Sequence, residues 1–520
     1  MTVDSPQPAP PAPAPSFAQR LQRFNTVKSR RVAAIVTPIA LLALALAVRL
    51  VNLDQFPILV FDETYYVKDA YTLYLHGYET RWGDEPNPAF EAGDDSAMSD
   101  EPSFVVHPPL GKWILGIGMA LFGFESPWAW RLPAVLVGAA LVLVTYFIAK
   151  GITRSTFWGG VAGYLLAIDS QAIVMSRTVL LDTVLALFVA LGIGALFLDR
   201  RHAPARVVRW MQEHGRWRPA FLLRPWLIVA GVAFGAAAAT KWSGLYFLAA
   251  FGLWSVLMDV LDQWKATKRG ISWLGFLTQG PASFLLVVVP AAATYVVSYA
   301  GWFLRGGYYR NWAEEDAANR ISWLPDWLPL DVHSFVHYQI STYEFHVELT
   351  KDHAFQSPAI EWLLMLRPTG FASESHDDGA VVQYVSAMPN PFIWWAGTVA
   401  IFVGLFMFGR TMNTALGATL LAIAAGYVPW LLYPDRTIFS FYTIVYTPFL
   451  IILIVILLRW LVCGLPGSPA SPDRRLAGSI FVGGYLLLVT IAYAFWSPVT
   501  YGYPIDQQWM RLRYWLPGWR

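Results

Sequence analysis

The chain has 520 residues, of which 56% are hydrophobic and only 14% are charged, and its formal net charge is +2. A soluble domain usually has about 25% charged residues, so this composition excludes a chain that faces water over most of its surface. A single cysteine, Cys463, excludes an intramolecular disulfide and argues against a cysteine-based zinc cluster.

Residues 1–31 are predicted to form a disordered cytoplasmic tail. The segment begins with a Pro/Ala tract, MTVDSPQPAPPAPAPS, that has no apolar core. It is therefore interpreted as neither a signal peptide nor a folded unit. The basic residues that would keep this end inside the cell are Arg20, Arg23, Lys28, Arg30 and Arg31.

Eleven segments are predicted to span a membrane as helices, because a hydrocarbon core of about 30 Å requires ~20 apolar residues. They lie at roughly 32–50, 130–149, 157–174, 179–198, 225–240, 244–261, 275–298, 393–409, 414–432, 439–458 and 477–496. The sequence thus predicts an all-α polytopic membrane protein. An odd number of spans places the two chain ends on opposite sides, with the N-terminus cytoplasmic and the C-terminus extracytoplasmic.

The loop charges agree with this orientation in the cytoplasmic (plasma) membrane. Segments 200–224, 265–269 and 459–475 are basic, as the positive-inside rule requires of cytoplasmic loops. The two long loops, about 51–129 and 302–392, are acidic and are predicted to be external. The candidate catalytic and binding residues are therefore expected at the external ends of the helices.

The first long loop opens with adjacent carboxylates in FDETYY, Asp62 and Glu63, flanked by Phe61, Tyr65 and Tyr66. An aromatic, partly dry setting raises the proton affinity of a carboxylate and suits it to act as a base. Since consecutive side chains point in different directions, the two acids are not expected to share one task. The alternative is an acidic helix start that interacts with the helix dipole.

The segment HPPLGKW follows later in this loop and contributes His107 and Lys112. Its two prolines block a helix before Leu110, and the apolar stretch after them is too short to span. Both basic side chains could line a site for an anionic headgroup. Alternatively, His107 caps a turn and Lys112 reaches toward lipid phosphate.

Further charges fall at the external ends of the predicted helices: Arg131, Arg177, Asp182 and Lys241. Charged groups near the membrane usually pair with one another or line a watery cavity. Arg177 and Asp182 could simply satisfy each other. What favours a functional role is that all of these charges lie at the same end as Asp62, and Arg131, Arg177, Asp182 and Lys241 are therefore predicted to bind the substrate.

Arg436 lies in the short external turn of WLLYPDRTIFSFY. The fork of donors on an arginine suits a phosphate, and the aromatic residues that follow could pack against a prenyl chain. The alternative is an interface arginine that anchors the turn. The sequence contains no GxxxxGK[ST], GxGxxG, HExxH or CxxC motif, which agrees with a substrate activated on a membrane lipid.

The order and spacing of FDETYYVKDAYTLYLHGYE, HPPLGKW, WRLPA, RTVLLDT, TKWSG and SPAIEWLLMLRP resemble the protein O-mannosyltransferase family, and in particular its actinobacterial branch. The resemblance implies a GT-C glycosyltransferase fold over residues 32–520, without the MIR domain of eukaryotic relatives because 302–392 is too short. It implies transfer of mannose from polyprenyl-phosphate-mannose to Ser or Thr of secreted polypeptides. It also implies that Asp62 is the general base, that Glu63 organises the loop, that Arg131 serves the active-site face and that Arg436 lies near the donor phosphate.

The implied reaction requires a base, cations that stabilise the leaving phosphate and an extended acceptor. Inverting single displacement satisfies these needs, with no cofactor or metal required in principle, although the acidic loops leave a divalent ion open. Nucleic acid is not an expected partner, whereas membrane lipids are. The sequence leaves open the acceptor proteins, the prenyl length, dimerisation and docking on the secretion translocon. Two alternatives are another GT-C glycosyltransferase acting on a glycan or lipid, and a membrane transporter.

Overall fold

The computed structural model of the chain describes residues 26–214, 222–267, 273–465 and 467–519. The tail predicted over residues 1–31 lies largely outside these described residues. Its last five residues belong to helix α2, Val27–Leu50, so the first apolar helix begins earlier than predicted. The side chain of Thr26 caps α2 by accepting a hydrogen bond from the Ser29 backbone N–H at 3.1 Å. This contact satisfies one of the free amides of the first turn.

Within the described residues, eight helices are long and apolar enough to cross a membrane, and three further apolar helices are shorter. The eight are α2, α6 (Pro127–Thr153), α12 (Gly244–Thr267), α13 (Trp273–Ser298), α18 (Pro391–Thr411), α21 (Pro472–Tyr501) and two composite spans. The first composite span, Leu181–Trp210, joins α9 (Leu181–Arg200) to α10 (Ala203–His214), and the second, Thr414–Leu432, joins α19 (Thr414–Tyr427) to η3 (Val428–Leu432). The shorter ones are α5 (Leu110–Phe122), α11 (Pro225–Ala238) and α20 (Thr447–Cys463). A multi-pass membrane protein is confirmed, whereas the predicted count of eleven spans is not.

One predicted span, 157–174, is not a continuous helix. It consists of α7 (Thr156–Ala167) and α8 (Ser170–Met175), which are separated at Asp169. The buried Asp169 carboxylate accepts hydrogen bonds from a backbone N–H of α8 and from that of Asn390, each at 3.0 Å. The prediction was wrong because hydropathy does not reveal that this carboxylate caps a second helix.

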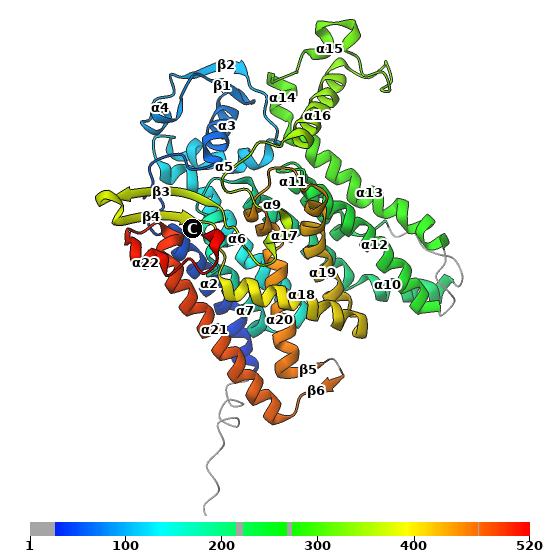
Figure 1. The fold of residues 1–520 in the computed structure, drawn as a ribbon. Helices are drawn as coiled ribbons and strands as arrows, with labels where there is room; N and C mark the ends of the chain where they lie inside the picture. The colour runs from blue at the N-terminus through cyan, green and yellow to red at the C-terminus, as the bar shows by residue number, and fades with distance from the viewer. Residues whose placement is uncertain (1–25, 215–221, 268–272, 466, 520) are drawn as a thin grey trace, which may run out of the picture.

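Both long loops are folded. In Figure 1 the first loop and residues 300–348 of the second lie at the top of the helix bundle, whereas the strands of the second loop lie lower, on the left. The first loop contains α3 (Glu63–His76), β1 (Thr80–Trp82), α4 (Asn87–Glu91) and β2 (Met98–Pro102), followed by α5. The second contains α14 (Ala300–Arg305), α15 (Trp312–Glu315), η1 (Ala317–Asn319), α16 (Leu330–Glu348), α17 (Ala359–Trp362), β3 (Gly370–His376), η2 (Asp377–Gly379) and β4 (Val381–Ser386). We call the top of the bundle in Figure 1, which carries residues 51–126 and 300–348, the loop end.

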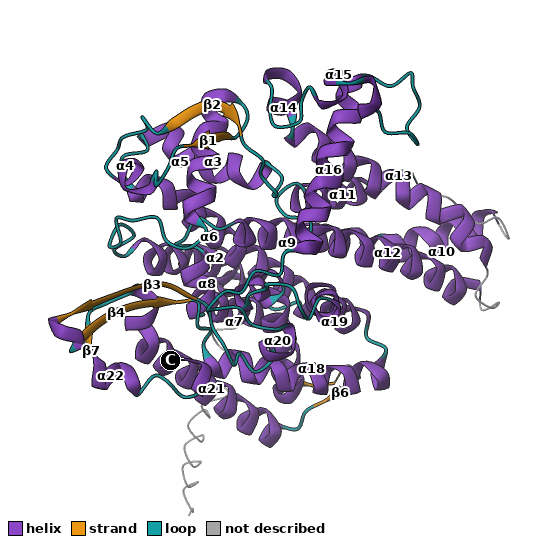
Figure 2. Cartoon of the chain, turned by 45° about the horizontal axis from the view of Figure 1, so that its top comes forward, coloured by secondary structure: helices purple, strands orange, loops and turns teal. Residues whose placement is uncertain are grey.

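Three small antiparallel sheets accompany the helices, as the orange strands of Figure 2 show. Strand β1 pairs with β2, β5 (Gly464–Leu465) pairs with β6 (Ser468–Pro469), and β4 lies between β3 and β7 (Ile505–Asp506). The pairing of Val382 with Ile505 joins the second long loop to the C-terminal segment. The remaining elements are η4 (Ser440–Val445), α22 (Gln507–Arg511) and η5 (Pro517–Trp519).

The two long loops meet through backbone contact between Gly77 and Gly301. Gly77 ends α3 in the left-handed conformation, with φ +87°, and donates its N–H to the Leu73 carbonyl. A Cβ atom at Gly301 would lie 1.9 Å from the Gly77 carbonyl oxygen. Only glycine allows this approach, which packs α14 of the second loop against the end of α3.

The centre of the bundle is built around α20, in which every residue from Thr447 to Ile456 is buried. A helix that is apolar on all sides belongs in the interior of a bundle. By contrast, only 11% of the most apolar window of α2 and 22% of that of α21 are buried within the protein. Their exposed apolar side chains suit contact with lipid.

Candidate active site

Asp62 and Glu63 lie at the start of α3, at the loop end of the bundle, and their carboxylates have different partners. Asp62 occupies the N-cap position, but its side chain makes no capping hydrogen bond. The Tyr66 side chain, one helical turn later, hydrogen-bonds to it. Burial raises the pKa of the Asp62 carboxyl to about 6, and the Lys241 ammonium opposes this shift. Such a carboxylate binds a proton more readily than an ordinary aspartate while staying mostly ionised at pH 7.

Glu63 is fully buried, and its carboxylate accepts four hydrogen bonds. Arg131 donates two of them, from Nε at 3.0 Å and from Nη2 at 2.8 Å. The backbone N–H groups of Val60 and Val179 donate the others at 3.0 and 2.9 Å. Since its acceptor sites are filled by the protein, Glu63 is suited to hold the loop in place rather than to exchange protons with a substrate.

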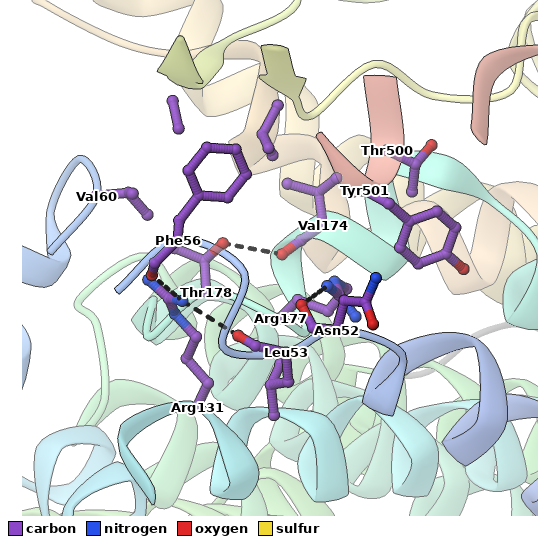
Figure 3. A pocket seen from close by; sticks show the side chains of 12 residues that line it. Asn52, Leu53, Phe56, Val60, Arg131, Val174, Arg177, Thr178, Thr500 and Tyr501 are labelled. Carbon is purple, nitrogen blue, oxygen red and sulfur yellow. Dashed lines mark hydrogen bonds between the residues drawn. The ribbon is translucent and has the colours of Figure 1, made fainter. Parts of the chain in front are cut away.

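All five N–H groups of Arg131 have protein acceptors. Besides Glu63, the guanidinium donates to the carbonyl oxygens of Leu53 and Phe56 at 3.2 and 2.8 Å (Figure 3). It also donates to the carbonyl oxygen of Ile58 at 2.9 Å. No donor is left for a phosphate. The structure therefore corrects the prediction that Arg131 contacts the substrate, because this side chain instead joins Glu63 to the chain segment before α3.

Arg177 also binds backbone rather than an anion. Its guanidinium donates to carbonyl oxygens within residues 49–52 and packs over the Tyr501 ring at 5.0 Å. Arg131 and Arg177 line a cavity of about 30 Å³, which has room for one or two water molecules but not for a sugar phosphate (Figure 3). The predicted substrate contact of Arg177 is corrected accordingly, and so is its alternative pairing with Asp182.

Asp182 pairs instead with Lys241, which lies in the turn between α11 and α12. The Lys241 ammonium is 3.0 and 3.1 Å from the two carboxylate oxygens of Asp182. It also lies 3.9 Å from the centre of the Tyr442 ring, a cation–π contact. Burial by itself lowers the pKa of Lys241, but the interactions with Asp182, Tyr442 and Asp62 together outweigh burial, so the pKa is raised. Lys241 therefore stays charged next to Asp62.

Lys241 and Arg436 line the same cavity of about 300 Å³, which is large enough for a sugar or a phosphate group. Its remaining lining is mostly aromatic and imidazole: His107, Trp242, Ser243, Leu245, Tyr246, Tyr343, His346, Val347, Trp430 and Tyr433. The Arg436 guanidinium packs over Trp430 at 5.4 Å, and its Nε has no hydrogen-bond partner among the described residues. Two cations, one with a free donor, make this cavity suited to an anion.

Two stacked imidazoles line the cavity together with the two cations. The rings of His107 and His346 are 5.1 Å apart, and Arg436 Nη2 lies 3.2 Å from His346 Nδ1. Burial, together with the nearby Lys241 and His346, holds the pKa of His107 well below its ordinary value. Burial and then Arg436 lower the pKa of His346 to about 4. Both rings are therefore neutral at pH 7, so the positive charge of the cavity comes from the lysine and the arginine.

Lys112 does not reach this cavity. Its ammonium is buried between the carboxylates of Glu79 and Asp69, in contact with the first and 3.4 Å from the second. Burial lowers the pKa of Lys112, but the two carboxylates outweigh it and raise the pKa. The predicted headgroup contact of Lys112 is corrected, because the lysine fastens α5 to α3 while His107, from the same motif, lines the cavity.

Five of the nine predicted site residues lie together: Asp62, His107, Asp182, Lys241 and Arg436. Asp62 is not among the cavity-lining residues and borders the cavity through Lys241, while the Tyr66 ring lies 5.9 Å from that of His107. Sequence reasoning missed His346, which reaches the cavity from α16. No motif marks this histidine, and only the packing of α16 reveals its position.

Comparison with known proteins identifies the family. The family model for dolichyl-phosphate-mannose-protein mannosyltransferase matches residues 126–302, and that for the C-terminal four-transmembrane region of protein O-mannosyltransferase matches 332–519. A polyprenol-phosphate-mannose–protein mannosyltransferase of Mycolicibacterium smegmatis is 32% identical, with 99% of this chain and 96% of that protein covered. One of Mycobacterium tuberculosis is 33% identical, with 89% and 86% covered.

The chain belongs to the polyprenol-phosphate-mannose–protein mannosyltransferase family. It is thus a glycosyltransferase, and the transporter alternative is wrong. The Saccharomyces cerevisiae protein O-mannosyltransferase Pmt1–Pmt2 complex, solved with its sugar donor, has a chain that superposes with a TM-score of 0.70 at 16% identity, covering 95% of this chain and 93% of that one. This likeness concerns the fold alone, and it confirms the predicted GT-C architecture.

Proposed function

We propose that this mannosyltransferase transfers mannose from polyprenyl-phosphate-mannose to Ser or Thr hydroxyls of secreted polypeptides. The observation that carries the proposal is the partly buried carboxylate of Asp62 beside Lys241, which lines a cavity together with Arg436. The names of the relatives supply the classes of donor and acceptor. A base next to an anion site provides the two groups that such a transfer requires.

In the proposed mechanism, Asp62 takes the proton of the acceptor hydroxyl as that oxygen attacks the anomeric carbon of mannose. The bond between this carbon and the phosphate oxygen breaks, and polyprenyl phosphate leaves with the bonding electrons. Arg436 and Lys241 stabilise the charge on the departing phosphate. One base and a leaving group that needs little protonation give a single displacement, which inverts the anomeric configuration.

The cavity lining supports a lipid-linked donor. Aromatic and aliphatic side chains, including Trp242, Leu245, Tyr246, Trp430 and Tyr433, stand beside the two cations. Cations suit the phosphate, and the apolar groups suit the sugar face or the first prenyl units. The neutral imidazoles of His107 and His346 add hydrogen-bonding groups without repelling the cations.

We further propose that the loop end faces the extracytoplasmic side of the plasma membrane and that the N-terminus is cytoplasmic. The charge pattern supports this orientation, because 459–475 and the basic residues around α10 lie at helix ends away from the long loops. Acceptors would then meet the site as they emerge from the membrane. Cysteine accessibility tests this topology, with one cysteine placed in the first long loop and another in the β5–β6 turn.

The decisive experiment incubates purified enzyme with radiolabelled polyprenyl-phosphate-mannose and a Ser/Thr-rich peptide. We expect label on the peptide with inverted anomeric configuration, and none with Asp62→Asn, which removes the proton acceptor but keeps the side-chain shape. The described residues contain no group of three or more His, Cys, Asp or Glu arranged to hold a metal ion. One base and two cations provide the groups that the transfer requires, so we propose that no metal is needed and that EDTA leaves the rate unchanged. Full activity of Asp62→Asn would remove this residue from the mechanism.

A further inference from the structure

Phe61, directly before Asp62, has a strained backbone. Its φ is +52°, in the left-handed region that a bulky side chain rarely adopts. The residue after Asp62 is held by its own contacts, because Glu63 is bound by Arg131 and Val179. The direction of the Asp62 carboxylate therefore depends on what holds the chain at residue 61.

Four aromatic rings surround the Phe61 side chain. The ring centres of His353, Phe371, Phe439 and Phe441 lie 5.5, 5.1, 5.4 and 5.7 Å from that of Phe61. Two of these residues belong to the second long loop, and the other two lie at the start of η4. We call these four rings the Phe61 cage. Its members also contact one another, because Phe439 stacks on Phe441 at 5.4 Å and meets His353 at 5.0 Å.

The chain segment 436–442 links the cage to the cavity. Arg436 lines the cavity, Phe439 and Phe441 contact Phe61, and Tyr442 packs against the Lys241 ammonium. This short segment thus contains one of the two cations proposed to bind the donor phosphate and contacts the other. It also contacts Phe61, the residue next to the proposed base. A shift of this segment would move these groups together.

We propose that Phe61 is a positioning residue: the Phe61 cage holds it in the left-handed conformation that directs the Asp62 carboxylate toward Lys241. The cage thereby keeps the base aligned with the segment that carries Arg436. This inference rests on the proposed function, in which Asp62 accepts the proton of the acceptor hydroxyl. A misplacement of about 1 Å in such a group costs on the order of 100-fold in rate.

The variant Phe61→Gly tests the contribution of the Phe61 cage separately from that of the backbone conformation. Glycine adopts a positive φ without strain, so this variant keeps the observed backbone accessible but loses the ring that holds it. We expect kcat to fall about 10- to 100-fold, while the KM for polyprenyl-phosphate-mannose stays within about twofold because the two cations are unchanged. The acid limb of the pH–rate profile should move to lower pH than in the wild type, because a released Asp62 carboxylate becomes hydrated and its pKa falls.

A second variant and a control keep the test independent of folding. Phe371→Leu leaves Phe61 in place and loosens the cage, and we expect a smaller loss of kcat with the same shift of the acid limb. Phe335→Leu removes a ring from a separate aromatic group of the same loop, where Phe335 lies 5.0 Å from Tyr299 and 5.7 Å from Trp302. Per mole of folded enzyme, this control should keep the wild-type kcat and acid limb.

The outcomes distinguish this inference from the proposed function. An active wild-type enzyme whose Phe61→Gly variant keeps both kcat and the acid limb overturns the positioning role alone. The same holds if Phe371→Leu and the Phe335→Leu control behave alike. A wild-type enzyme that transfers no mannose overturns the proposed function, and the inference falls with it.

Discussion

Glu63→Gln changes the shape of the side chain little, yet we expect it to destabilise the enzyme strongly. Each carboxylate oxygen of Glu63 accepts one hydrogen bond from Arg131 and one from a backbone N–H. A glutamine has only one oxygen, so in either orientation its amide nitrogen faces one N–H of Arg131 and one of Val60 or Val179. Two buried donors are left without an acceptor.

The size of the effect follows from these two lost contacts. A hydrogen bond to a charged group contributes about 1.5–3 kcal/mol, and a stranded buried donor costs about 1–3 kcal/mol. Their sum, about 2.5–6 kcal/mol, brackets the roughly 3–5 kcal/mol that it costs to break a buried ion pair by removing one partner. Glu101→Gln is the matched control, because Glu101 pairs with Arg81 at 3.4 Å on the exposed surface, where such pairs contribute little.

The assay is thermal unfolding of the purified variants in detergent at pH 7, together with mannosyl transfer per mole of folded enzyme. We expect a clearly lowered melting temperature for Glu63→Gln and a wild-type value for Glu101→Gln. Asp62→Asn should show the opposite behaviour, with a retained melting temperature and no transfer. Equal melting temperatures for Glu63→Gln and wild type would refute the reasoning that Glu63 and Arg131 hold the loop.

Three further predictions concern the cavity and the first long loop. Since burial raises the pKa of Asp62 to about 6, kcat/KM should fall as the pH drops below about 6 and the base becomes protonated; a profile that stays flat through this range contradicts the assignment. Arg436→Ala should raise the KM for the donor about tenfold or more through the loss of a charged hydrogen bond, and the KM for the peptide should change less. The control Arg81→Ala, at an exposed residue, should leave both constants unchanged. An unaltered donor KM for Arg436→Ala counts against the phosphate role. Lys112→Met leaves two largely buried carboxylates, Asp69 and Glu79, without their cation, so it should lower the melting temperature. Burial already raises the folded pKa of Asp69 to about 6, so ionisation costs stability as the pH rises through this value, and loss of the lysine raises that pKa further. The difference in melting temperature between wild type and Lys112→Met should therefore be largest above pH 7 and become smaller on acidification. A difference that does not depend on pH would show that the carboxylates are not its cause.

Much of the architecture could be predicted from the sequence because it depends on local composition. Long apolar runs require helices that are shielded from water, and acidic loops between them mark regions outside the bilayer. The continuous span over 157–174 could not be excluded in this way. Whether an aspartate such as Asp169 interrupts a helix depends on the partners that reach it, here the backbone N–H of Asn390.

The candidate site was predictable in its residue types but not in their roles. Asp62, His107, Lys241 and Arg436 were found from their motifs and from their common position at one end of the helices. The motifs did not reveal His346, which enters from a helix in the second long loop. They also did not show that Lys112 pairs with Asp69 and Glu79 instead of lining the cavity, because these partners come from α3 and the segment that follows it.

The sequence by itself determined that the chain crosses the membrane repeatedly and that its charged groups concentrate at one end, since burial in lipid constrains every stretch of about 20 residues independently. Only the tertiary structure decided which of those charges remain available for a ligand. Arg131 has its five N–H groups filled by Glu63 and by backbone carbonyls, and Arg177 donates to three backbone carbonyls, whereas Arg436 lines the cavity and its Nε has no hydrogen-bond partner among the described residues. The amino-acid sequence does not show whether a given arginine binds backbone carbonyls or lines a cavity. The difference arises from acceptors that folding brings from distant segments.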